Sequence, residues 1–447
     1  MNLWFESALL DDGWADRVRL TLAHGRIETV EAGVDPDVGD DRHFVALPGL
    51  PNVHSHAFQR AMAGLAEARG RADDDFWSWR ELMYRFVGRI GPEECEAIAA
   101  LAYAEMLEAG FTRVGEFHYL HHTPDGSRYD DVAEMSGRIA AAAEAAGIGL
   151  TLLPVFYAHG GFGGQPAGAA QARFLNDVDG FAALVERAGA KLAPDGVIGV
   201  APHSLRAATP EQLRLLPPLA KGGPVHIHIA EQMKEVADCI VWSGKPPVRW
   251  LLDELPVDTR WTLVHATHVE ADEVAGIVAS GAVAGLCPIT EANLGDGVFP
   301  AAAFLQEGGM IGVGSDSNVR IDAAEELRLL EYGQRLTRRA RNVLAGADRP
   351  ATGARLFAAA VQGGGRSLGA ETGLAAGRPA DIVSLNRGDS AFAERKGDAL
   401  IDSWVFASHR AVDCVWRGGI KQVEGGRHRR REAIEARYRT ALARLTA

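Results

Sequence analysis

The sequence predicts an α/β protein, a (β/α)8 TIM-like barrel joined to a small β-sandwich domain formed from both chain termini. Two observations favour this class. The middle of the 447-residue chain alternates eight short, β-rich apolar runs with Ala/Leu/Glu/Arg-rich stretches of helical spacing. Both ends of the chain carry strand–turn–strand patterns that cannot bury their own faces alone. A doubly wound nucleotide-binding sheet is the alternative, but no glycine-rich phosphate loop follows the first apolar run.

The small β domain is predicted from hairpin patterns at the two ends. Residues 17–22 and 26–30 alternate like two strands around a His-Gly turn. Residues 381–385 and 414–423 have the same strand–turn–strand character. Each pattern needs a partner, and the other terminus offers one. The boundaries that follow are 1–47 plus 375–428 for the small β domain, 48–374 for the barrel and 429–447 for a C-terminal helix.

The barrel strands are predicted from where each apolar run stops. Segments 92–109, 131–146, 210–220 and 270–279 have helical spacing and lie between these runs. Segment 58–89 reads as a long ordered loop over the barrel mouth. Active sites of barrels lie at the C-terminal ends of their strands, so titratable residues there are candidate site residues. The eight ends lie at or near His56, His118, His159, His203, His228, His265, Cys287 and Asp316.

The first apolar run ends in His54-Ser-His56. Residues two apart on a strand share a face, so both imidazoles point the same way and can hold one metal ion. The pattern alone is modest evidence, because His-x-His also occurs in satisfied cores and on surfaces. The later strand ends strengthen the metal interpretation, since they offer the missing ligands.

The fifth run contributes a second pair of histidines and a carboxylate. His226 and His228 share a face, and Glu231 follows just past the strand end. Glu231 can therefore hang over a metal ion without binding it and carry protons between water and a leaving group. A helix-capping Glu beside a buried His is the structural alternative. His226 is the weaker ligand candidate and can equally be structural.

Two further strand ends complete the chemistry. His265 can polarise a substrate carbonyl or imine, or orient the water. Asp316 follows a Gly-rich strand and can bind a metal ion through one oxygen while the other accepts a proton. A lone Asp in such a place is usually a turn or cap residue. Its place in the order of strands favours ligation here.

Together these motifs resemble the amidohydrolase superfamily, and within it the mononuclear deaminase branch. Binuclear members bridge two metals with a carboxylated lysine at a middle strand end, whereas segments 150–159 and 197–205 contain no Lys. The resemblance implies one divalent metal ion, for which zinc is expected although imidazole and carboxylate also suit iron and other metals. It implies the ligands His54, His56, His228 and Asp316, the catalytic residues Glu231, His265 and Asp316, and either Asp316 or Glu231 as first base.

Segments 50–65, 75–80, 115–120 and 201–206 resemble the formimidoylglutamate deiminases of bacterial histidine degradation, and the similarity runs through most of the chain. The resemblance implies hydrolysis of N-formimidoyl-L-glutamate to N-formyl-L-glutamate and ammonia. This substrate carries two carboxylates, and a guanidinium can fork onto each of them. The substrate-binding candidates are Arg80 and Arg206, with Gln59, Tyr119 and His203 adding hydrogen bonds. A surface salt bridge is the structural alternative for either Arg.

Two other functions stay open at this point. One is deamination of another small amidine or a purine-type ring; the other is a non-catalytic barrel that binds a small ligand or a protein. The net charge of −13 argues against nucleic-acid and anionic-membrane partners. The four dispersed cysteines and the absence of a signal-peptide pattern favour a reducing cytoplasm. A homodimer is what the resemblance implies.

Overall fold

The structure is a computed structural model that describes residues 1–67 and 76–446. A parallel sheet forms its centre, in the order β10-β11-β12-β13-β5-β6-β7-β8. An isolated parallel bridge between Val200 and Val225 brings the fourth strand segment beside β10 and so closes the barrel. The strands are β5 (Leu50–Ser55), β6 (Phe111–His118), β7 (Gly149–Phe156), β8 (Val197–Ile198), β9 (Ala201–Pro202), β10 (Val225–Ile229), β11 (Trp261–His265), β12 (Val283–Leu286) and β13 (Met310–Val313).

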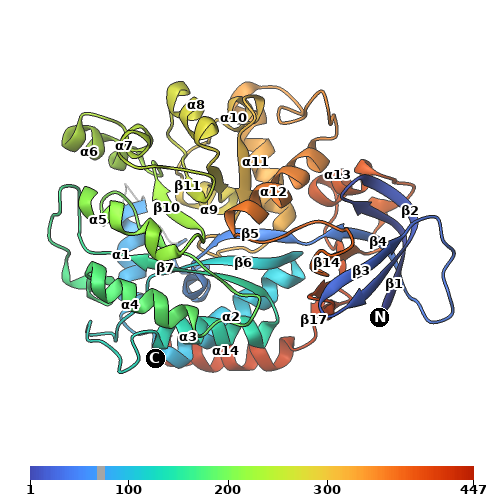
Figure 1. The fold of residues 1–447 in the computed structure, drawn as a ribbon, viewed down its shortest axis with the longest axis horizontal. Coiled ribbons are helices and arrows are strands. Elements are labelled where there is room, and N and C mark those ends of the chain that lie inside the picture. Colours follow the sequence, from blue (N-terminus) through green and yellow to red (C-terminus); the bar gives the residue numbers. More distant parts are fainter. Residues whose placement is uncertain (68–75, 447) are drawn as a thin grey trace.

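Helices surround this sheet (Figure 1). The four helical segments expected from the sequence are present, although residues 131–133 precede the third helix and the 210–220 segment divides into α5 and a 3-10 turn. The helices are α1 (Phe76–Val87), α2 (Pro92–Glu108), α3 (Glu134–Ala146), α4 (Val178–Gly189), α5 (Pro210–Leu215), α6 (Met233–Ser243), α7 (Pro247–Glu254), α8 (Ala271–Ser280), α9 (Pro288–Leu294), α10 (Ala301–Gln306), α11 (Ala323–Arg338), α12 (Thr352–Ser367), α13 (Asp398–Phe406) and α14 (Arg431–Thr446).

The expectation of a loop over residues 58–89 was wrong for much of its described length, and residues 68–75 of that segment lie outside the described residues. The chain forms a 3-10 helix, η1 (Ala57–Met62), directly after β5, and α1 begins at Phe76. The helix α1 buries Met83 and Val87 against the barrel. Arg80, a candidate substrate-binding residue from the sequence, lies on this helix.

Strands from both chain ends form a second sheet, at the right of Figure 1. Its order is β17-β16-β15-β14-β4-β1-β2-β3, and β14 pairs antiparallel with β4, which joins the two termini. One face has its own apolar core around Phe5 and Trp416, whereas Val45 and Val415 join the barrel core. The strands are β1 (Asn2–Leu10), β2 (Gly13–Ala23), β3 (Arg26–Glu31), β4 (Asp41–Pro48), β14 (Ile382–Leu385), β15 (Val412–Arg417), β16 (Ile420–Glu424) and β17 (Arg427–His428).

The turns of this sheet explain its hairpins. Gly418 and Gly419 join β15 to β16 with φ of 54° and 71°, a backbone region that glycine enters without strain. The α/β class, with a barrel and a β domain drawn from both termini, is therefore confirmed. The numbered domain boundaries stay a prediction. Among the described residues, no helix is both long and apolar enough to cross a bilayer.

Candidate active site

Three imidazoles meet at the C-terminal ends of β5 and β10. The Nε2 atoms of His54 and His56 lie 3.2 Å apart, and the Nε2 of His228 lies 3.0 Å from that of His54. Asp316, just beyond β13, places Oδ1 3.5 Å from His54 Nε2 and 3.3 Å from His56 Nε2. All four side chains are buried. The structure thus brings together the four residues expected as metal ligands.

The chemistry of this cluster fits a metal ion. Burial lowers the pKa of His54 to about 3 and also lowers the pKa values of His56 and His228, so the rings are neutral and keep their lone pairs. Burial acts against the charge of Asp316, but the hydrogen bond with His54 and the electrostatic attraction of the surrounding histidines, including the cationic His265, outweigh it and lower the pKa of that carboxyl. Ligand atoms of a tetrahedral zinc ion lie about 3.3 Å apart when each bond is about 2.0 Å long. The observed spacings are close to that value.

Second contacts orient two of the rings. The Nδ1 of His56 lies 2.9 Å from the carbonyl oxygen of Phe117, and the Nδ1 of His228 lies 3.1 Å from that of His203. A hydrogen on each Nδ1 leaves Nε2 as the atom with a free lone pair. The backbone therefore fixes the tautomer that metal binding requires.

A buried polar network joins the ends of β5 and β13. Asn52 accepts a hydrogen bond from the backbone of Ser315 at 3.0 Å and donates to its hydroxyl at 2.6 Å. The Ser315 hydroxyl donates to Asn318, whose amide donates to the hydroxyl of Ser55 at 3.1 Å. The backbone N–H of Asp316 donates to the carbonyl oxygen of His54, and that of His56 donates to the carbonyl oxygen of Asp316. These contacts hold together candidate ligands that are far apart in the sequence.

His265 lies between carboxylates beside the cluster. Its Nε2 is 3.8 Å from Glu231 Oε1 and 3.8 Å from Asp316 Oδ2, and its Nδ1 is 3.3 Å from Glu291 Oε1. Burial alone would lower the pKa of His265, but the charge of Glu231 and the contacts with Glu291 and Asp316 raise it to about 10. Burial raises the pKa of Glu231 to about 7. The site thus holds one cationic imidazole and a carboxyl that can exchange protons near neutral pH.

Backbone strain accompanies these positions. Ala230, His265 and Asp316 have φ of 53°, 69° and 42°, in the left-handed region that non-glycine residues seldom adopt. Such conformations cost roughly 1–3 kcal/mol each and gather at functional sites. The chain turns abruptly after β10, β11 and β13, and these turns present the functional side chains to one cavity.

The cavity at the barrel mouth gathers the remaining candidates. The amide of Gln59 donates to the Tyr119 hydroxyl at 2.9 Å, and Arg80 reaches the cavity from α1. His226 lies elsewhere, buried, with Nε2 2.8 Å from the carbonyl oxygen of Ser367, and thus sits outside the histidine cluster. The lining includes His56, Gln59, Arg80, Tyr119, His203, Arg206, His228, Glu231, His265 and Asp316, all expected from the sequence.

Sequence reasoning missed several neighbours of the site. Glu291 contacts His265 from the first turn of α9. It was missed because an acidic residue in a first helical turn is usually explained by its favourable interaction with the helix dipole. Tyr84 and Tyr157 line the cavity, and only the four-residue spacing of Tyr84 from Arg80 hinted at it. Cys287 lies within 4.8 Å of His265 and Asp316, but burial raises the pKa of its thiol well above the ordinary value. A neutral thiol is a weak ligand.

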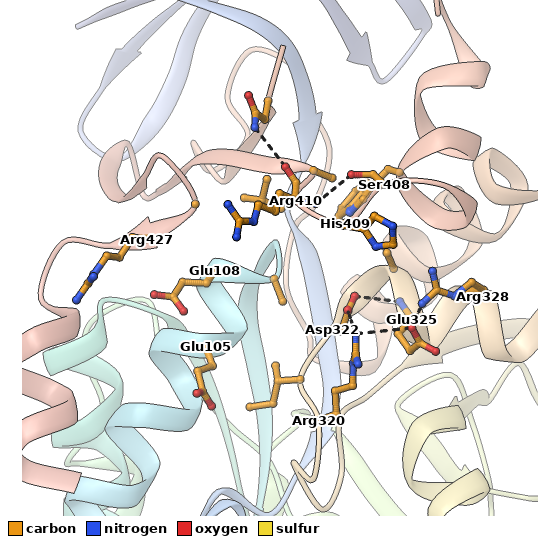
Figure 2. A pocket seen from close by; sticks show the side chains of 18 of the residues that line it. Glu105, Glu108, Arg320, Asp322, Glu325, Arg328, Ser408, His409, Arg410 and Arg427 are labelled. Carbon is orange, nitrogen blue, oxygen red and sulfur yellow. Dashed lines mark hydrogen bonds and ion pairs between the residues drawn. The ribbon is translucent and has the colours of Figure 1, made fainter. Parts of the chain in front are cut away.

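A larger cavity lies away from the barrel mouth, beside α2, α11 and α13 (Figure 2). Its charged side chains largely pair with one another. Arg320 binds Asp322 at 3.0 Å, Arg328 binds Glu325, and Arg431 reaches Glu108 at 2.7 Å. In the described part of the chain, no group of potential metal ligands lines it. The smaller cavity with the histidines is therefore the candidate active site.

Two family models match the chain. The amidohydrolase family matches residues 45–421, and the N-terminal domain of formimidoylglutamate deiminase HutF matches residues 3–44. The amidohydrolase family is metal-dependent, which agrees with the histidine cluster.

Individual proteins agree with these models. The chain is 52% identical to the formimidoylglutamate deiminase of Pseudomonas aeruginosa over 95% of each chain. It is 31% identical to a 5-methylthioadenosine/S-adenosylhomocysteine deaminase of Natronomonas pharaonis over 87% of each. A solved amidohydrolase from Brucella melitensis superposes with a TM-score of 0.95 at 53% identity, covering 100% of both chains. With both models and these relatives in agreement, the chain belongs to the formimidoylglutamate deiminases of the amidohydrolase family.

Proposed function

We propose that this protein hydrolyses N-formimidoyl-L-glutamate to N-formyl-L-glutamate and ammonia, a deimination step in histidine degradation. One observation carries the proposal. A single cavity holds His56, His228 and Asp316 at one end and two arginines, Arg80 and Arg206, in its lining. This lining favours a substrate with opposite charges at its two ends. The cationic amidine would lie beside the carboxylates of the protein, and the dicarboxylate tail beside its guanidinium groups.

The proposed metal ligands are His54, His56, His228 and Asp316, and the proposed ion is Zn²⁺. A bound divalent ion at these residues supplies an acidified water as the nucleophile. The mixed imidazole and carboxylate donor set suits zinc, and the close spacing of the nitrogens suits a small ion. One ion is proposed because no lysine ends the third or fourth barrel strand.

Glu231 and Asp316 are proposed to carry the protons. As water oxygen bonds to the formimidoyl carbon, one of these carboxylates takes a proton, and the carbon becomes tetrahedral. That proton then passes to the amino nitrogen and the carbon–nitrogen bond breaks, so that ammonia leaves. The added hydroxyl gives its remaining proton to a carboxylate, and the carbonyl forms. His265 stays cationic, with its Nε2 3.8 Å from each of the two carboxylates, and so favours their ionised forms. Either carboxylate can be the first base.

Arg80 and Arg206 are proposed to bind the two carboxylates, helped by Gln59, Tyr119 and His203. The hydrogen bond from Gln59 occupies the Tyr119 oxygen as acceptor, so the phenol hydrogen remains available to a ligand. A ligand that lacks a carboxylate would forfeit the charge-assisted hydrogen bonds that the proposed arginine contact supplies. Selection against such ligands is therefore expected to be strong.

We also propose a cytoplasmic homodimer without nucleic-acid or membrane partners. All four cysteines are unpaired and buried, which suits a reducing compartment, and the net charge is −13. Light scattering coupled to size-exclusion chromatography tests the dimer directly. A single peak at the mass of one chain, 47.7 kDa, would contradict it.

The function is tested by ammonia release from N-formimidoyl-L-glutamate with metal content measured on the same zinc-loaded sample. We expect about one metal equivalent per chain and stoichiometric N-formyl-L-glutamate. A metal-loaded protein that releases ammonia only from purine-type rings would replace this function with the alternative deaminase. A metal-free, inactive protein that still binds a ligand would support the binding module.

A further inference from the structure

Two phenols surround Arg80 in the substrate cavity. Arg80 and Tyr84 are four residues apart on α1 and so share a helix face. The Nε of Arg80 donates a hydrogen bond to the Tyr84 oxygen at 2.6 Å, and its guanidinium carbon lies 5.1 Å from the centre of that ring. Tyr84 therefore restrains the position of the Arg80 guanidinium at the cavity.

Tyr157 contacts the same guanidinium from a different part of the barrel. It follows the end of β7, and its oxygen accepts a hydrogen bond from Arg80 Nη2 at 3.3 Å. Gln171 donates to the same oxygen at 2.5 Å. The orientation of the Gln171 amide is fixed, because its oxygen accepts from the backbone N–H of Gly168 at 2.7 Å.

These contacts decide where the phenol hydrogens point. A phenol oxygen accepts up to two hydrogen bonds and donates one. Two N–H groups fill the acceptor sites of Tyr157, so its hydrogen must point elsewhere, and its hydroxyl lines the cavity. Burial raises the pKa of Tyr84 to about 12, so this phenol also keeps its hydrogen. Within the described residues, neither hydroxyl has a protein acceptor at hydrogen-bond distance.

We propose that Tyr84 and Tyr157 are specificity-determining residues, which join Arg80 in a clamp and donate their hydroxyl hydrogens to one carboxylate of the substrate. This inference rests on the function proposed above and names binding groups that the sequence did not reveal. A guanidinium with two flanking phenol donors matches the oxygens of a carboxylate, which only accept hydrogen bonds. A neutral or cationic tail would leave both donors unpaired in a buried cavity.

The clamp is tested with Tyr84→Phe and Tyr157→Phe in the zinc-loaded protein. Each change keeps the ring and removes the hydroxyl, which is both a donor to the ligand and an acceptor for Arg80. A hydrogen bond to a charged group is worth roughly a factor of ten or more in affinity. We expect KM for N-formimidoyl-L-glutamate to rise about tenfold in each variant with kcat nearly unchanged. The matched control is Tyr438→Phe, a half-buried phenol on α14 outside the cavity, which is expected to leave KM unchanged.

Two shortened ligands separate a binding role from a general structural one. N-formimidoyl-4-aminobutanoate lacks the α-carboxylate, and N-formimidoyl-2-aminobutanoate lacks the side-chain carboxylate. The penalty of each Tyr→Phe change should vanish for the ligand that lacks the clamped carboxylate and persist for the other. An equal penalty with both ligands would overturn the clamp.

Calorimetric binding of N-formyl-L-glutamate distinguishes failure of the clamp from failure of the function. Suppose that the wild-type protein releases no ammonia, and that each variant binds N-formyl-L-glutamate about tenfold more weakly than the wild type does. The clamp then stands and the function does not. If wild-type protein releases ammonia while both variants keep wild-type KM and affinity, the clamp is refuted and the function stands. No binding by any form refutes both.

Discussion

The carboxyl groups of Glu231 and Asp316 differ in their pKa values. Burial raises the pKa of Glu231 to about 7, whereas the hydrogen bond with His54 and the attraction of the surrounding histidines hold the pKa of Asp316 below its ordinary value despite burial. Both carboxyls face the same ring nitrogen of His265, each with an oxygen 3.8 Å from its Nε2. The same imidazole therefore faces one carboxyl that titrates near neutrality and one that stays ionised.

The acid limb of the pH profile follows from this difference. If Glu231 takes the first proton, it must be ionised, so kcat/KM falls as pH drops through its pKa. A nearby divalent cation lowers that pKa, so the limb should lie between the ordinary 4.5 and about 7. Glu231→Gln should lose about 10²- to 10⁴-fold in kcat and also lose this limb. If kcat/KM of the wild-type protein shows no fall between pH 7 and pH 4.5, Asp316 rather than Glu231 takes the first proton.

Replacing a metal ligand should remove both metal and activity. His54→Ala takes one of three converging nitrogens away, and a catalytic metal supplies several kcal/mol to the transition state. At 1.36 kcal/mol per factor of ten, we expect kcat to fall at least about a thousandfold. Metal content and ammonia release measure this directly.

His159→Ala is the control for that change. His159 also follows a barrel strand, but its Nε2 pairs with Gln212 at 3.1 Å and it lies outside the histidine cluster. This variant should keep its metal and its activity. If it loses metal as His54→Ala does, the loss reports general unfolding rather than ligation.

At the scale of elements, we expect the geometry of the proposed metal ligands to depend on the contact between β5 and the end of β13. A Cβ on Gly314 would lie 2.8 Å from both the backbone nitrogen and oxygen of His54. Backbone cannot move aside as a flexible side chain can, so Gly314→Ala should lower the free energy of unfolding by about 1–3 kcal/mol. Metal affinity should fall with it, because His54 and Asp316 are held by the same contact.

Urea unfolding with parallel metal titration tests that element. Gly39→Ala is the matched control, since Gly39 lies in a loop with no atom within 4 Å of the new Cβ. We expect no change in its midpoint or its metal affinity. Wild-type metal affinity in Gly314→Ala would show that the spacing of the two strands does not set the ligand geometry.

The strand ends could be predicted from the sequence because each is an apolar run stopping at a titratable residue. The helix α1 was missed although its apolar residues recur at helical spacing, because the Trp-, Arg-, Asp- and Gly-rich composition of segment 58–89 as a whole favoured a loop. The network of Asn52, Ser315 and Asn318 also escaped prediction, because polar residues near a strand end look like turn residues. Tyr157, just after β7, and Arg80, on α1, meet only in the tertiary structure at the cavity, which no local pattern encodes.

At the scale of the whole molecule, the metal site ties together distant segments. Its proposed ligands span residues 54 to 316 and come from β5, β10 and the chain after β13. A ligand that binds only the folded state stabilises it by about 4 kcal/mol at a thousand times its Kd. Chelation should therefore lower the melting temperature by several degrees, and added zinc should restore it. Full metal loss with an unchanged melting temperature would contradict this linkage.

The small β sheet shows how far the global arrangement followed from sequence. The terminal hairpins predicted their own pairing, because neither can bury a face alone. The adjacency of β14 and β4 and the shared core around Val45 and Val415 depend on long-range packing. The order of the eight sheet strands therefore emerged only from the structure.

The most direct test of the account compares kcat/KM for N-formimidoyl-L-glutamate with that for the formimidoyl derivatives of glycine and aspartate, on one zinc-loaded preparation. The account predicts a preference for the glutamate compound over the glycine compound of at least about a hundredfold, because the glycine compound lacks the second carboxylate and so forfeits its charge-assisted hydrogen bonds. The aspartate compound should fall between them. Equal kcat/KM for all three would contradict recognition of two carboxylates by Arg80 and Arg206.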